Sequence, residues 1–315
     1  MATMVTTTSG LAPTMQTYYD RKMLEWAKTQ FVYANYAQKR SIPKNNGKTV
    51  QFRKWNLFTP NASAQALTEG VTPNAQNLSM TAITATVAQY GAYVEVSDLL
   101  DMTAIDNVIS DSSELLGEQM GNVLDMIVRD VMHTTTNIQY ANGKVGDANI
   151  TATDVLTVAE IRKAVRTLKK NKARKFTRKG GKPHFVCICD PSATYDLQSD
   201  SLWQDVSKYS SAEQIYDGEL GKLFGVVFVE STNEKVVNNT NSIGVHDTFV
   251  FGADAYGTID IAGSGAIKAI VKPHGSAGTA DPLDQRATVG AKVTAFAAAV
   301  LNSEWLLCIR HAVTA

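Results

Sequence analysis

The amino-acid sequence predicts a mixed α+β protein, and three observations support this fold class. A run of apolar residues at helical spacing ends near Met132, and short runs rich in β-branched and aromatic residues lie on both sides of it. A segment in which helix and strand patterns alternate begins near residue 151. With 315 residues, of which 44% are hydrophobic, the chain can bury one large core or two ordinary ones.

The N-terminal segment predicts a helix from about Tyr18 to Gln38, after 17 residues rich in threonine. Leu24, Ala27 and Phe31 fall on one face of this helix, and Trp26 is among its many aromatic residues. Such an amphipathic helix docks either on its own domain or on a neighbouring subunit, and the pattern leaves both options open.

Residues 49–96 predict a long β-hairpin without a core of its own. "TVQFRKWNLF" and "LSMTAITATVAQYGAYVEV" are β-prone runs, and the loop between them contains Pro60, Gly70 and Pro73. The second run does not alternate cleanly between apolar and polar residues, so neither face is marked as the buried one. Because an isolated two-stranded hairpin is marginal in water, we expect it to lie along another copy of the chain.

A long helix is predicted to end at about Met132, from apolar residues that recur every three or four positions and begin with Ile105, Val108 and Ile109. Its length would be about 40 Å at 1.5 Å per residue. Gly117 and Gly121 lie inside this helix. Since each costs up to about 1 kcal/mol relative to alanine, we expect close packing against the face that they share.

The middle of the chain predicts an α/β region. Thr157 and Glu160 have the spacing of a capping box at the start of a helix, and Asp190 followed by Pro191 suits the start of another. Strands are expected at residues 184–189, 225–230, 247–252 and 266–271.

The closing residues 281–315 contain two apolar runs, 289–300 and 305–313, joined by a polar turn. They predict an antiparallel strand pair or a short helix that leads into a strand, and we assign them to the domain of the long helix. The longest uninterrupted apolar run has seven residues, 295–301, whereas a membrane-spanning helix needs about 20. We therefore expect no membrane partner.

The composition argues against several classes of chemistry. Thirty basic and thirty acidic residues cancel, so no global charge indicates a nucleic acid or an anionic membrane as partner. Cys187 and Cys189 share one face of a predicted strand but lack the usual spacing of a zinc site. No nucleophile elbow or phosphate-binding loop is present, so we expect no enzyme and no catalytic, cofactor or metal site. The N-terminus lacks the pattern of a secretory signal. The three cysteines have no spacing that implies a disulfide framework, which favours synthesis in a reducing cytoplasm.

One strongly basic segment, residues 169–182, carries eight Lys or Arg and no acid. Cations at a helix C-terminus complement the helix dipole, so a solvated loop explains part of this charge. A contact with acids of a neighbouring subunit and a contact with DNA remain two further options. The candidate residues are Lys169, Lys170, Lys172, Arg174, Lys175, Arg178 and Lys179.

The order of these parts resembles the major capsid proteins of tailed bacteriophages, which have the Hong Kong 97 type of fold, and more specifically the coliphage N-four type family. The resemblance covers nearly the whole chain from about Tyr18. Its motifs are structural and not catalytic. They are "TEGVTP", "TATVAQYGAYVEVSDLLD", "ELLGEQMGNVLDMIVRDVM", "FGVVFVES" and "DPLDQRATVGAKVTAFAAAVLNSEWLLCIRHA".

The resemblance implies a division of the chain into parts. Residues 1–48 would be an N-terminal arm with a helix, and residues 49–96 an extended loop that reaches across the adjacent subunit. A peripheral domain around the long spine helix would comprise 97–150 and 266–315, and an inserted axial domain 151–265. The residues assigned to contacts between subunits are Phe52, Arg53, Lys54, Trp55, Glu69, Tyr90, Trp26 and Phe31.

The function implied is self-assembly into the icosahedral head shell around a double-stranded DNA genome. The expected partners are copies of the chain in pentamers and hexamers, a portal, and DNA bound without sequence specificity, with a decoration or cement protein as a further option. Because only about 17 residues precede the first predicted helix, we also expect a separate scaffolding protein. The expected location is the virion, after assembly in the bacterial cytoplasm. The alternatives are an encapsulin-like compartment and, in another class, a soluble α+β enzyme or nucleic-acid-binding protein.

Overall fold

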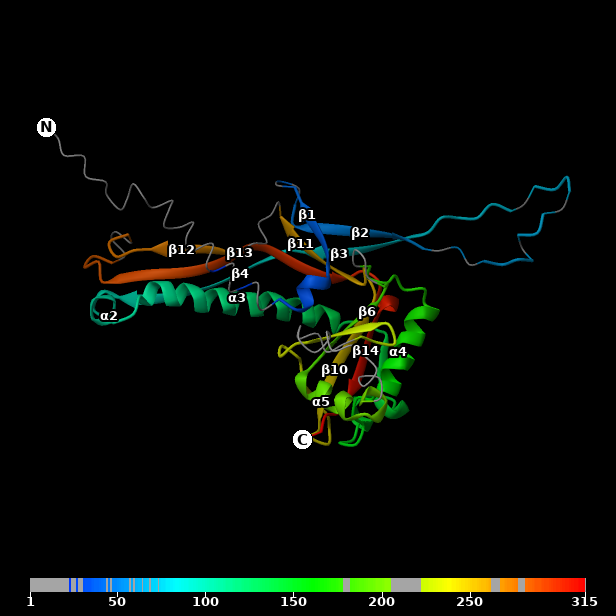
Figure 1. Ribbon diagram of the computed structural model, residues 1–315. Coiled ribbons are helices and arrows are strands. Elements are labelled where there is room, and N and C mark those ends of the chain that lie inside the picture. The colour runs from blue at the N-terminus through cyan, green and yellow to red at the C-terminus, as the bar shows by residue number, and fades with distance from the viewer. Residues whose placement is uncertain are drawn as a thin grey trace.

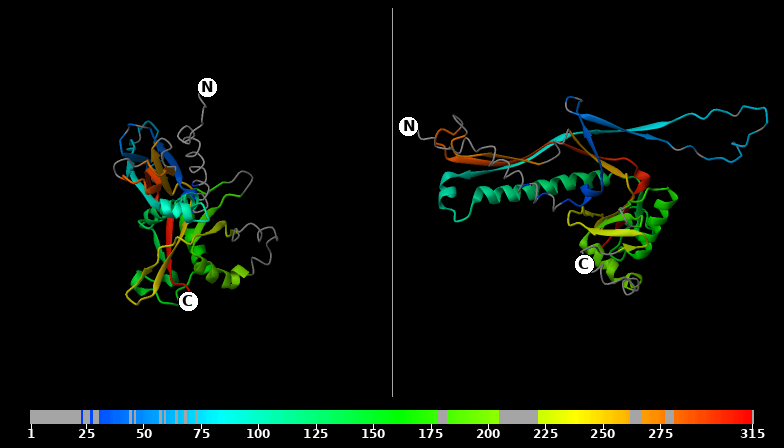
Figure 2. Two further views of the ribbon diagram at one scale, coloured as in Figure 1. Left: turned by 90° about the vertical axis from the view of Figure 1, so that its left-hand side faces the viewer. Right: turned by 45° about the horizontal axis from the view of Figure 1, so that its top comes forward.

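The computed structural model shows an elongated molecule with three parts (Figure 1). A sheet lies along a long helix, a compact lower part contains a second sheet, and a thin hairpin projects away from both (Figures 1 and 2). No helix in the described part of the chain is both long and apolar enough to cross a bilayer. The structure describes residues 23, 27, 31–43, 45, 47–56, 58, 60–63, 65–67, 69–72, 74–177, 182–204, 222–261, 267–276 and 281–314.

The first sheet has five strands in the order β1-β11-β13-β12, with β4 also paired to β13. Buried and more exposed residues largely alternate along β13, as expected for a strand with one face on a core. The buried face packs on the long helix α3, beneath the sheet in Figure 1. The strands are β1 (Gln38–Ile42), β4 (Ala88–Ser97), β11 (Tyr256–Ile261), β12 (Lys268–Lys272) and β13 (Arg286–Val300).

The predicted long helix is α3 (Val108–Met132), preceded by the short helix α2 (Asp98–Thr103). Its 25 residues span about 37 Å at 1.5 Å per residue. It starts later than the first apolar residue of the pattern, because Asn107 is the N-cap and accepts a hydrogen bond from the Ser110 amide at 3.1 Å. Ile105 therefore lies outside the helix and is fully exposed.

The close packing predicted at Gly117 and Gly121 is confirmed. A Cβ atom at either position would lie 2.7 Å from a backbone oxygen, that of Met23 at Gly117 and that of Ala27 at Gly121. Met23 and Ala27 are both helical and fully buried. The glycine face of α3 therefore packs against the N-terminal segment of the same chain. At Met23 and Ala27, this segment docks on its own subunit and not on a neighbour.

The predicted N-terminal helix does not extend to Gln38. Tyr33–Tyr36 form a 3-10 turn, and β1 begins at Gln38 and pairs in parallel with β11. The Asp125 carboxylate on α3 accepts hydrogen bonds from the backbone amides of Val32 and Ala34, at 3.1 and 3.0 Å, and so fixes the turn. Most of the predicted helix N-terminal to this turn lies outside the described residues.

The second sheet has seven strands in the order β5-β14-β10-β6-β8-β7, with the short β9 on β10. Helices α4 (Val158–Lys170) and α5 (Pro191–Ser199) contribute to the buried cluster on one face of this sheet, whereas its other face continues the core under α3. The strands are β5 (Ile138–Tyr140), β6 (Phe185–Cys189), β7 (Lys222–Leu223), β8 (Val226–Glu230), β9 (Val237–Asn238), β10 (Gly244–Phe251) and β14 (Leu306–His311).

The two predicted helix starts differ in outcome. Asp190 caps α5 as predicted and accepts a bond from the Ser192 amide at 3.0 Å, with Pro191 at the first helical position. Thr157 is the N-cap of α4, but no capping box forms. The Glu160 carboxylate bonds Gln139 Nε2 and Lys163 Nζ instead, each at 2.7 Å.

The predicted pairing of the two closing runs is wrong. β13 belongs to the five-stranded sheet, whereas β14 lies between β5 and β10 in the seven-stranded sheet. A 3-10 turn, Ser303–Trp305, separates them, and the amides of Leu301 and Asn302 both donate to the Ala255 carbonyl at 2.9 Å. Both faces of β14 reach buried clusters, so its apolar run is continuous and not alternating.

The sheets also divide the chain at residues other than the implied domain limits. β11, within the implied axial segment, belongs to the five-stranded sheet, and β5 and β14, within the implied peripheral segments, belong to the seven-stranded sheet. The chain thus crosses between the two parts several times.

The hairpin consists of β2 (Thr49–Trp55) and β3 (Met80–Thr86), which pair only with each other. It is shorter than the predicted 49–96, because β4 pairs with β13 instead. The base of the hairpin does have a core: Phe52 and Ala85 are buried with Ile42, Ile259 and small residues of β13. Only the part beyond the base projects free of the body (Figure 1).

Candidate functional site

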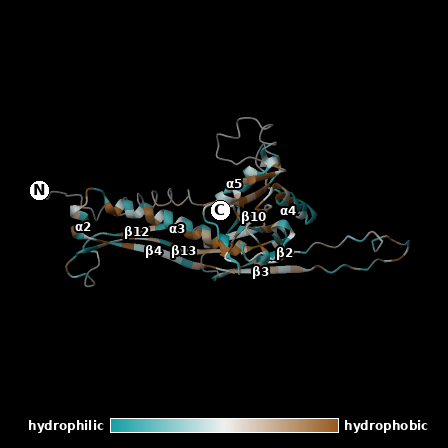
Figure 3. Cartoon of the chain, turned by 90° about the horizontal axis from the view of Figure 1, so that it is seen from below, coloured by the Kyte–Doolittle hydropathy of each residue, from teal (hydrophilic) through white to brown (hydrophobic). Residues whose placement is uncertain are grey.

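The projecting hairpin carries apolar side chains that have no core beside them. Just beyond the last pair of β2 and β3, the two strands are still joined by the Asn56 amide, which donates to the Ser79 carbonyl at 3.0 Å. Apolar and polar residues are mixed along it (Figure 3). The exposed large apolar residues between β2 and β3 or at their ends are Trp55, Phe58, Leu67, Val71, Leu78 and Met80. Such a surface, on a segment that projects away from its own body, is typical of a contact with another molecule.

The outer face of the five-stranded sheet contains a shallow hollow of about 470 Å³. In the register of the sheet, Gly290 of β13 lies opposite Tyr93 of β4 and opposite Ile270 of β12. Because Gly290 has no side chain, the exposed Tyr93 and Ile270 form two walls with bare backbone between them. This face is suited to receive an extended segment.

A basic cleft of about 740 Å³ lies at the base of the hairpin. β1 and β2 form one wall, with Arg40, Arg53 and Lys54, and the loop after α4 contributes Lys172 and Arg174. The Lys54 ammonium and the Arg174 guanidinium both lie 5.9 Å from the ring centre of Trp305, which is half-buried in the cleft. Two acids, Asp254 and Glu304, also line it.

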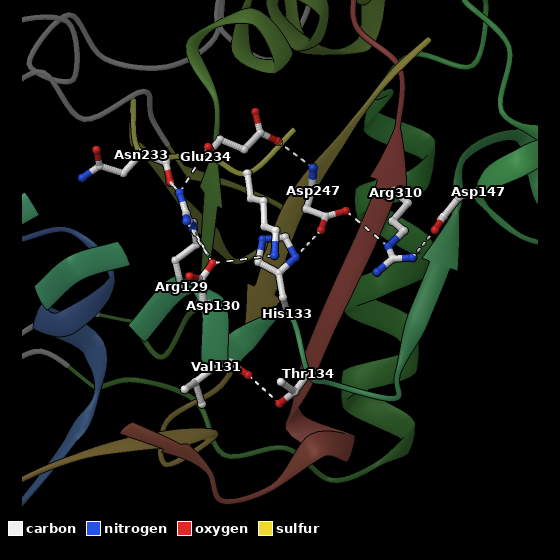
Figure 4. A network of polar contacts seen from close by, with 11 residues as sticks. Arg129, Asp130, Val131, His133, Thr134, Asp147, Asn233, Glu234, Asp247 and Arg310 are labelled. Atoms are coloured by element: carbon white, nitrogen blue, oxygen red, sulfur yellow. Dashed lines mark hydrogen bonds and ion pairs between the residues drawn. The ribbon is translucent and has the colours of Figure 1, made fainter. Parts of the chain in front are cut away.

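A chain of polar contacts joins the end of α3 to the seven-stranded sheet (Figure 4). Arg129 Nη1 donates to the carbonyl oxygens of Asn233 and Glu234, at 2.7 and 3.3 Å. The Glu234 carboxylate in turn accepts a bond from the Asp247 amide at 2.6 Å. Burial raises the pKa of Glu234, and hydrogen bonds and the charge of His246 offset part of that rise.

The same chain continues across β10 and β14. The carboxylate of Asp247 lies 2.5 Å from His133 Nδ1 and 3.4 Å from Arg310 Nε, and Arg310 Nη1 bonds Asp147 at 2.6 Å (Figure 4). His133 is the C-cap of α3, and the other residues come from β10, β14 and a 3-10 turn, so the contacts fix the end of the spine helix to the lower sheet.

One group of side chains in the described residues has the composition of a metal site: Asp190, Glu234 and His246, whose ligand atoms lie within 4.8 Å of one another. Their polar atoms are already engaged. His246 Nδ1 lies 2.7 Å from Glu234 Oε2, and Asp190 accepts from the Ser192 amide. Although burial lowers the pKa of His246, the neighbouring carboxylates raise it by more, so the group forms an internal ion pair.

The cysteines do not contribute to such a group. Cys187, Cys189 and Cys308 are free and buried, and burial raises the thiol pKa of Cys187. Cys189 Sγ lies 3.3 Å from Thr194 Oγ1, at the start of α5. Their position is that of small apolar residues in a core.

The residues predicted to contact other subunits differ in how exposed they are. Trp55, Arg53 and Glu69 are exposed, whereas Phe52 is 5% exposed and packs in the core of its own chain. Tyr90 and Phe31 are half-buried and pack against the main core. Lys54 is half-buried in the basic cleft, and Trp26 lies outside the described residues.

The predicted basic segment is also divided. Lys169, Lys170, Lys172, Arg174 and Lys175 are exposed, and only Lys172 and Arg174 line the cleft. Arg178 and Lys179 lie outside the described residues. The ring of Phe176 packs edge-on against Tyr36 and Phe251, which explains this aromatic residue as part of the core.

Sequence reasoning missed Arg40, Asp254, Glu304 and Trp305, which complete the cleft, and the contacts of Asp247. These residues lie far apart in the sequence and none belongs to a local motif, so only the fold brings them together. The signal that was available was the surplus of cations at 169–182.

Comparison with known proteins decides what kind of molecule carries these surfaces. The model of a family described as phage capsid protein matches residues 96–281, more than half of the chain. The chain belongs to this phage capsid protein family. No curated protein sequence matches it.

Solved structures support the same conclusion at the level of the fold. The capsid of Ralstonia phage GP4 is 13% identical with a TM-score of 0.69, and covers 91% of this chain and 90% of its own. The capsid of cyanophage Pam1 is 16% identical with a TM-score of 0.66, and covers 90% of this chain and 92% of its own. This protein therefore has the Hong Kong 97-like fold of phage major capsid proteins, and it is a structural protein of the head shell.

The fold alone does not separate a phage shell from other protein shells. A virus-like particle from Pyrococcus furiosus, 9% identical with a TM-score of 0.53, covers 94% of this chain and 99% of its own. The family match, however, is to phage capsid proteins, so this capsid protein is located in the virion.

Proposed function

We propose that this capsid protein assembles into an icosahedral shell around double-stranded DNA, and that the hairpin holds neighbouring subunits together. The observation that carries the proposal is the row of exposed apolar residues on the hairpin, which have no core in the described part of their own chain. Burying them in a neighbour would remove apolar surface from water at each of many equivalent contacts.

The dimensions suit this arrangement. About 20 residues lead from Thr49 to the region of Glu69, so the hairpin reaches on the order of 60 Å when extended. The spine helix of a neighbour, with 25 residues, is about 37 Å long. The hollow between Tyr93 and Ile270 on the outer face of the sheet is the surface that we assign to the neighbour's hairpin.

The remaining parts of the proposal concern the partners. The five-stranded sheet with α3 serves as the peripheral part, and the seven-stranded sheet as the axial part that meets its copies in pentamers and hexamers. A separate scaffolding protein directs closure in the bacterial cytoplasm, a portal occupies one vertex, and DNA is enclosed without sequence specificity. The capsid family to which the chain belongs supports assembly with copies of itself, whereas the scaffolding protein, the portal and the DNA are part of the proposal alone.

The test is to shorten the hairpin. Residues 56–79 would be replaced by an Asn-Gly turn between the paired Trp55 and Met80, which is compatible with the ladder of β2 and β3. We expect a subunit with an unchanged circular dichroism spectrum and a cooperative melt, but no shells in negative-stain images of cells that express the scaffolding protein. Shells of normal size from the shortened chain would contradict the proposal.

A further inference from the structure

One stretch of this capsid protein is acidic, although the charges of the whole chain cancel. From Ser97 to Val128 the sequence contains no Lys, Arg or His. The acids in this stretch are Asp98, Asp101, Asp106, Asp111, Glu114, Glu118 and Asp125. Asp101, Asp106 and Asp111 are exposed, in α2, in the link to α3 and in the first turn of α3. Asp98 is half-buried, and the Asp101 carboxylate lies 3.7 Å from His274 Nε2 of the same subunit. This end of the molecule, the acidic end, lies opposite the hairpin (Figure 1).

The acidic end also exposes apolar side chains. Leu99, Met102 and Ile105 are 69%, 81% and 102% exposed. They alternate in sequence with Asp98, Asp101 and Asp106. A surface that combines carboxylates with unburied aliphatic groups fits a partner that offers cations around an apolar centre.

The basic cleft at the base of the hairpin combines cations with apolar surface in this way. Among the described residues, only Arg174 of its five cations has an acidic partner, Asp254, at 3.5 Å. Trp305 and Trp55 supply apolar surface in the same cleft. Arg53 and Lys172 are exposed beside it.

The two surfaces cannot meet within one subunit, because the whole length of α3 and its sheet lies between them (Figures 1 and 2). We infer that the basic cleft of one subunit receives the α2 segment, residues 98–106, of a neighbouring subunit. This inference rests on the proposed function and adds a second contact to the one that the hairpin makes. A head-to-tail contact between different surfaces generates rings when the rotation closes, as capsomers require.

The geometry of the hairpin is compatible with this contact. A neighbour whose α2 lies at the base of the hairpin has its spine helix and sheet alongside the rest of the hairpin. From Asn56 to Glu69 the extended chain reaches on the order of 40 Å, similar to the length of α3. One docking event therefore places both the acidic end against the cleft and the apolar hairpin against the hollow. Linked contacts of this kind strengthen each other without either being strong alone.

DNA is the competing occupant of the cleft, and two observations disfavour it. Asp254 and Glu304 line the cleft, and both would repel a phosphate backbone. Trp305 is half-buried between Lys54 and Arg174, so its ring face is occupied by cations and not open to a base. The same two acids also oppose the carboxylates of α2, so the difference between the two occupants lies in the exposed Leu99, Met102 and Ile105, whose apolar surface DNA does not offer.

The experiment is a charge swap in full-length protein that is expressed with its scaffolding protein. The first variant is R53E/K172E, in the cleft, and the second is D101K/D106K, in the acidic end. We expect each to lower the yield of shells at least about tenfold, since juxtaposed like charges cost several kcal/mol. The combined variant restores opposite charges across the contact, so its yield should return to within about threefold of wild type.

Matched controls separate this effect from a change in total charge. R166E/K170E reverses two exposed cations of α4 outside the cleft. It should assemble as wild type and should not rescue D101K/D106K. Circular dichroism and melting temperature of the free subunits show whether each variant is folded, and the rescue is read only from the ratio of yields among folded variants.

The outcomes are distinguishable. Wild-type protein that forms no shell would defeat the proposed function itself. Shells from wild type, together with a combined variant that is no better than the single ones, would overturn only the contact between cleft and acidic end. If D101K/D106K assembles normally while R53E/K172E lowers the yield of shells, the cleft binds something other than the acidic end, and the inference is wrong.

Discussion

A single buried carboxylate, Asp125, fixes the turn before β1 to the spine helix. It accepts the amides of Val32 and Ala34, and it is fully buried. Burial raises its pKa and these hydrogen bonds lower it, with burial the larger effect. Sequence reasoning had no reason to select it, because it is one isolated acid within an apolar helix.

Two substitutions of Asp125 should have different effects. D125A leaves two buried amides without an acceptor and should lower the free energy of unfolding by about 2–4 kcal/mol. D125N keeps the acceptor oxygen and removes the buried charge, so its stability near pH 7 should lie within about 1 kcal/mol of wild type. Urea denaturation of free subunits measures both. Equal losses in the two variants would show that the charge, and not the acceptor, matters.

His311 should make the stability of the subunit depend on pH. The side chain is fully buried between Thr248 Oγ1 and the Ala312 carbonyl, and burial lowers its pKa to about 4. The folded state therefore holds it neutral, whereas the unfolded chain protonates it near 6.5. Its contribution is complete above that value and is lost as the pH falls towards 4, by up to about 3 kcal/mol.

The measurement compares wild type with H311Q. Other groups titrate in the same range, and His246 has the opposite sign because its pKa is raised, so only the difference between the two proteins is informative. We expect H311Q to be less stable at pH 7.5, with a difference that shrinks by pH 4.5. The control is H184Q, at a half-buried histidine outside this site, which measures the effect of removing a histidine elsewhere in the fold. A constant difference in H311Q would refute the assignment.

At the scale of elements, the packing of α3 against the N-terminal segment depends on two missing side chains. Alanine normally stabilises a helix by about 1 kcal/mol relative to glycine. At Gly117 and Gly121 the added Cβ would lie 2.7 Å from a backbone oxygen, so the segment with Met23 and Ala27 must move. We expect G117A and G121A each to lower the free energy of unfolding by about 1–3 kcal/mol, and so to lower the melting temperature.

The control for these variants is Q119A, at an exposed position of the same helix. It should change stability by no more than about 0.5 kcal/mol. Limited proteolysis adds a second measurement, because a displaced segment should be cut faster in G117A and G121A. Variants that are as stable and as resistant as wild type would mean that the close approach is not maintained in solution.

The elements show which parts of the fold could be predicted from sequence. The long helix, the strand at 184–189 and the cap at Asp190 follow from local periodicity and local hydrogen bonding, and the structure has all three. The partner of β14 could not be predicted, because a continuous apolar run does not say which sheet it enters. The capping box failed for a similar reason: Gln139 and Lys163 compete for Glu160, and Gln139 is distant in sequence.

At the scale of the whole molecule, the fold could be predicted from the sequence, whereas the candidate functional surfaces could not. The order of arm, hairpin, long helix and returning strands was sufficient for the capsid fold. The cleft and the polar chain at the end of α3 were not predictable, since each collects single residues from segments that are more than 100 positions apart. Local patterns therefore predict elements, whereas surfaces between subunits depend on how distant segments come together.

Substitutions in the outer part of the hairpin test whether its apolar residues stabilise the free subunit or only the assembled shell. Leu67, Val71 and Leu78 are exposed, so L67S/V71S/L78S should leave the melting temperature of the free subunit within about 2 °C of wild type. The same variant should fail to form shells, because it removes apolar surface that only a neighbour buries. F52A is the matched comparison: Phe52 is buried at the base, and its loss should cost the free subunit about 3–5 kcal/mol. If the triple variant destabilises the subunit as much as F52A, or assembles normally, the outer hairpin is part of the subunit's own fold and not the contact that joins the shell.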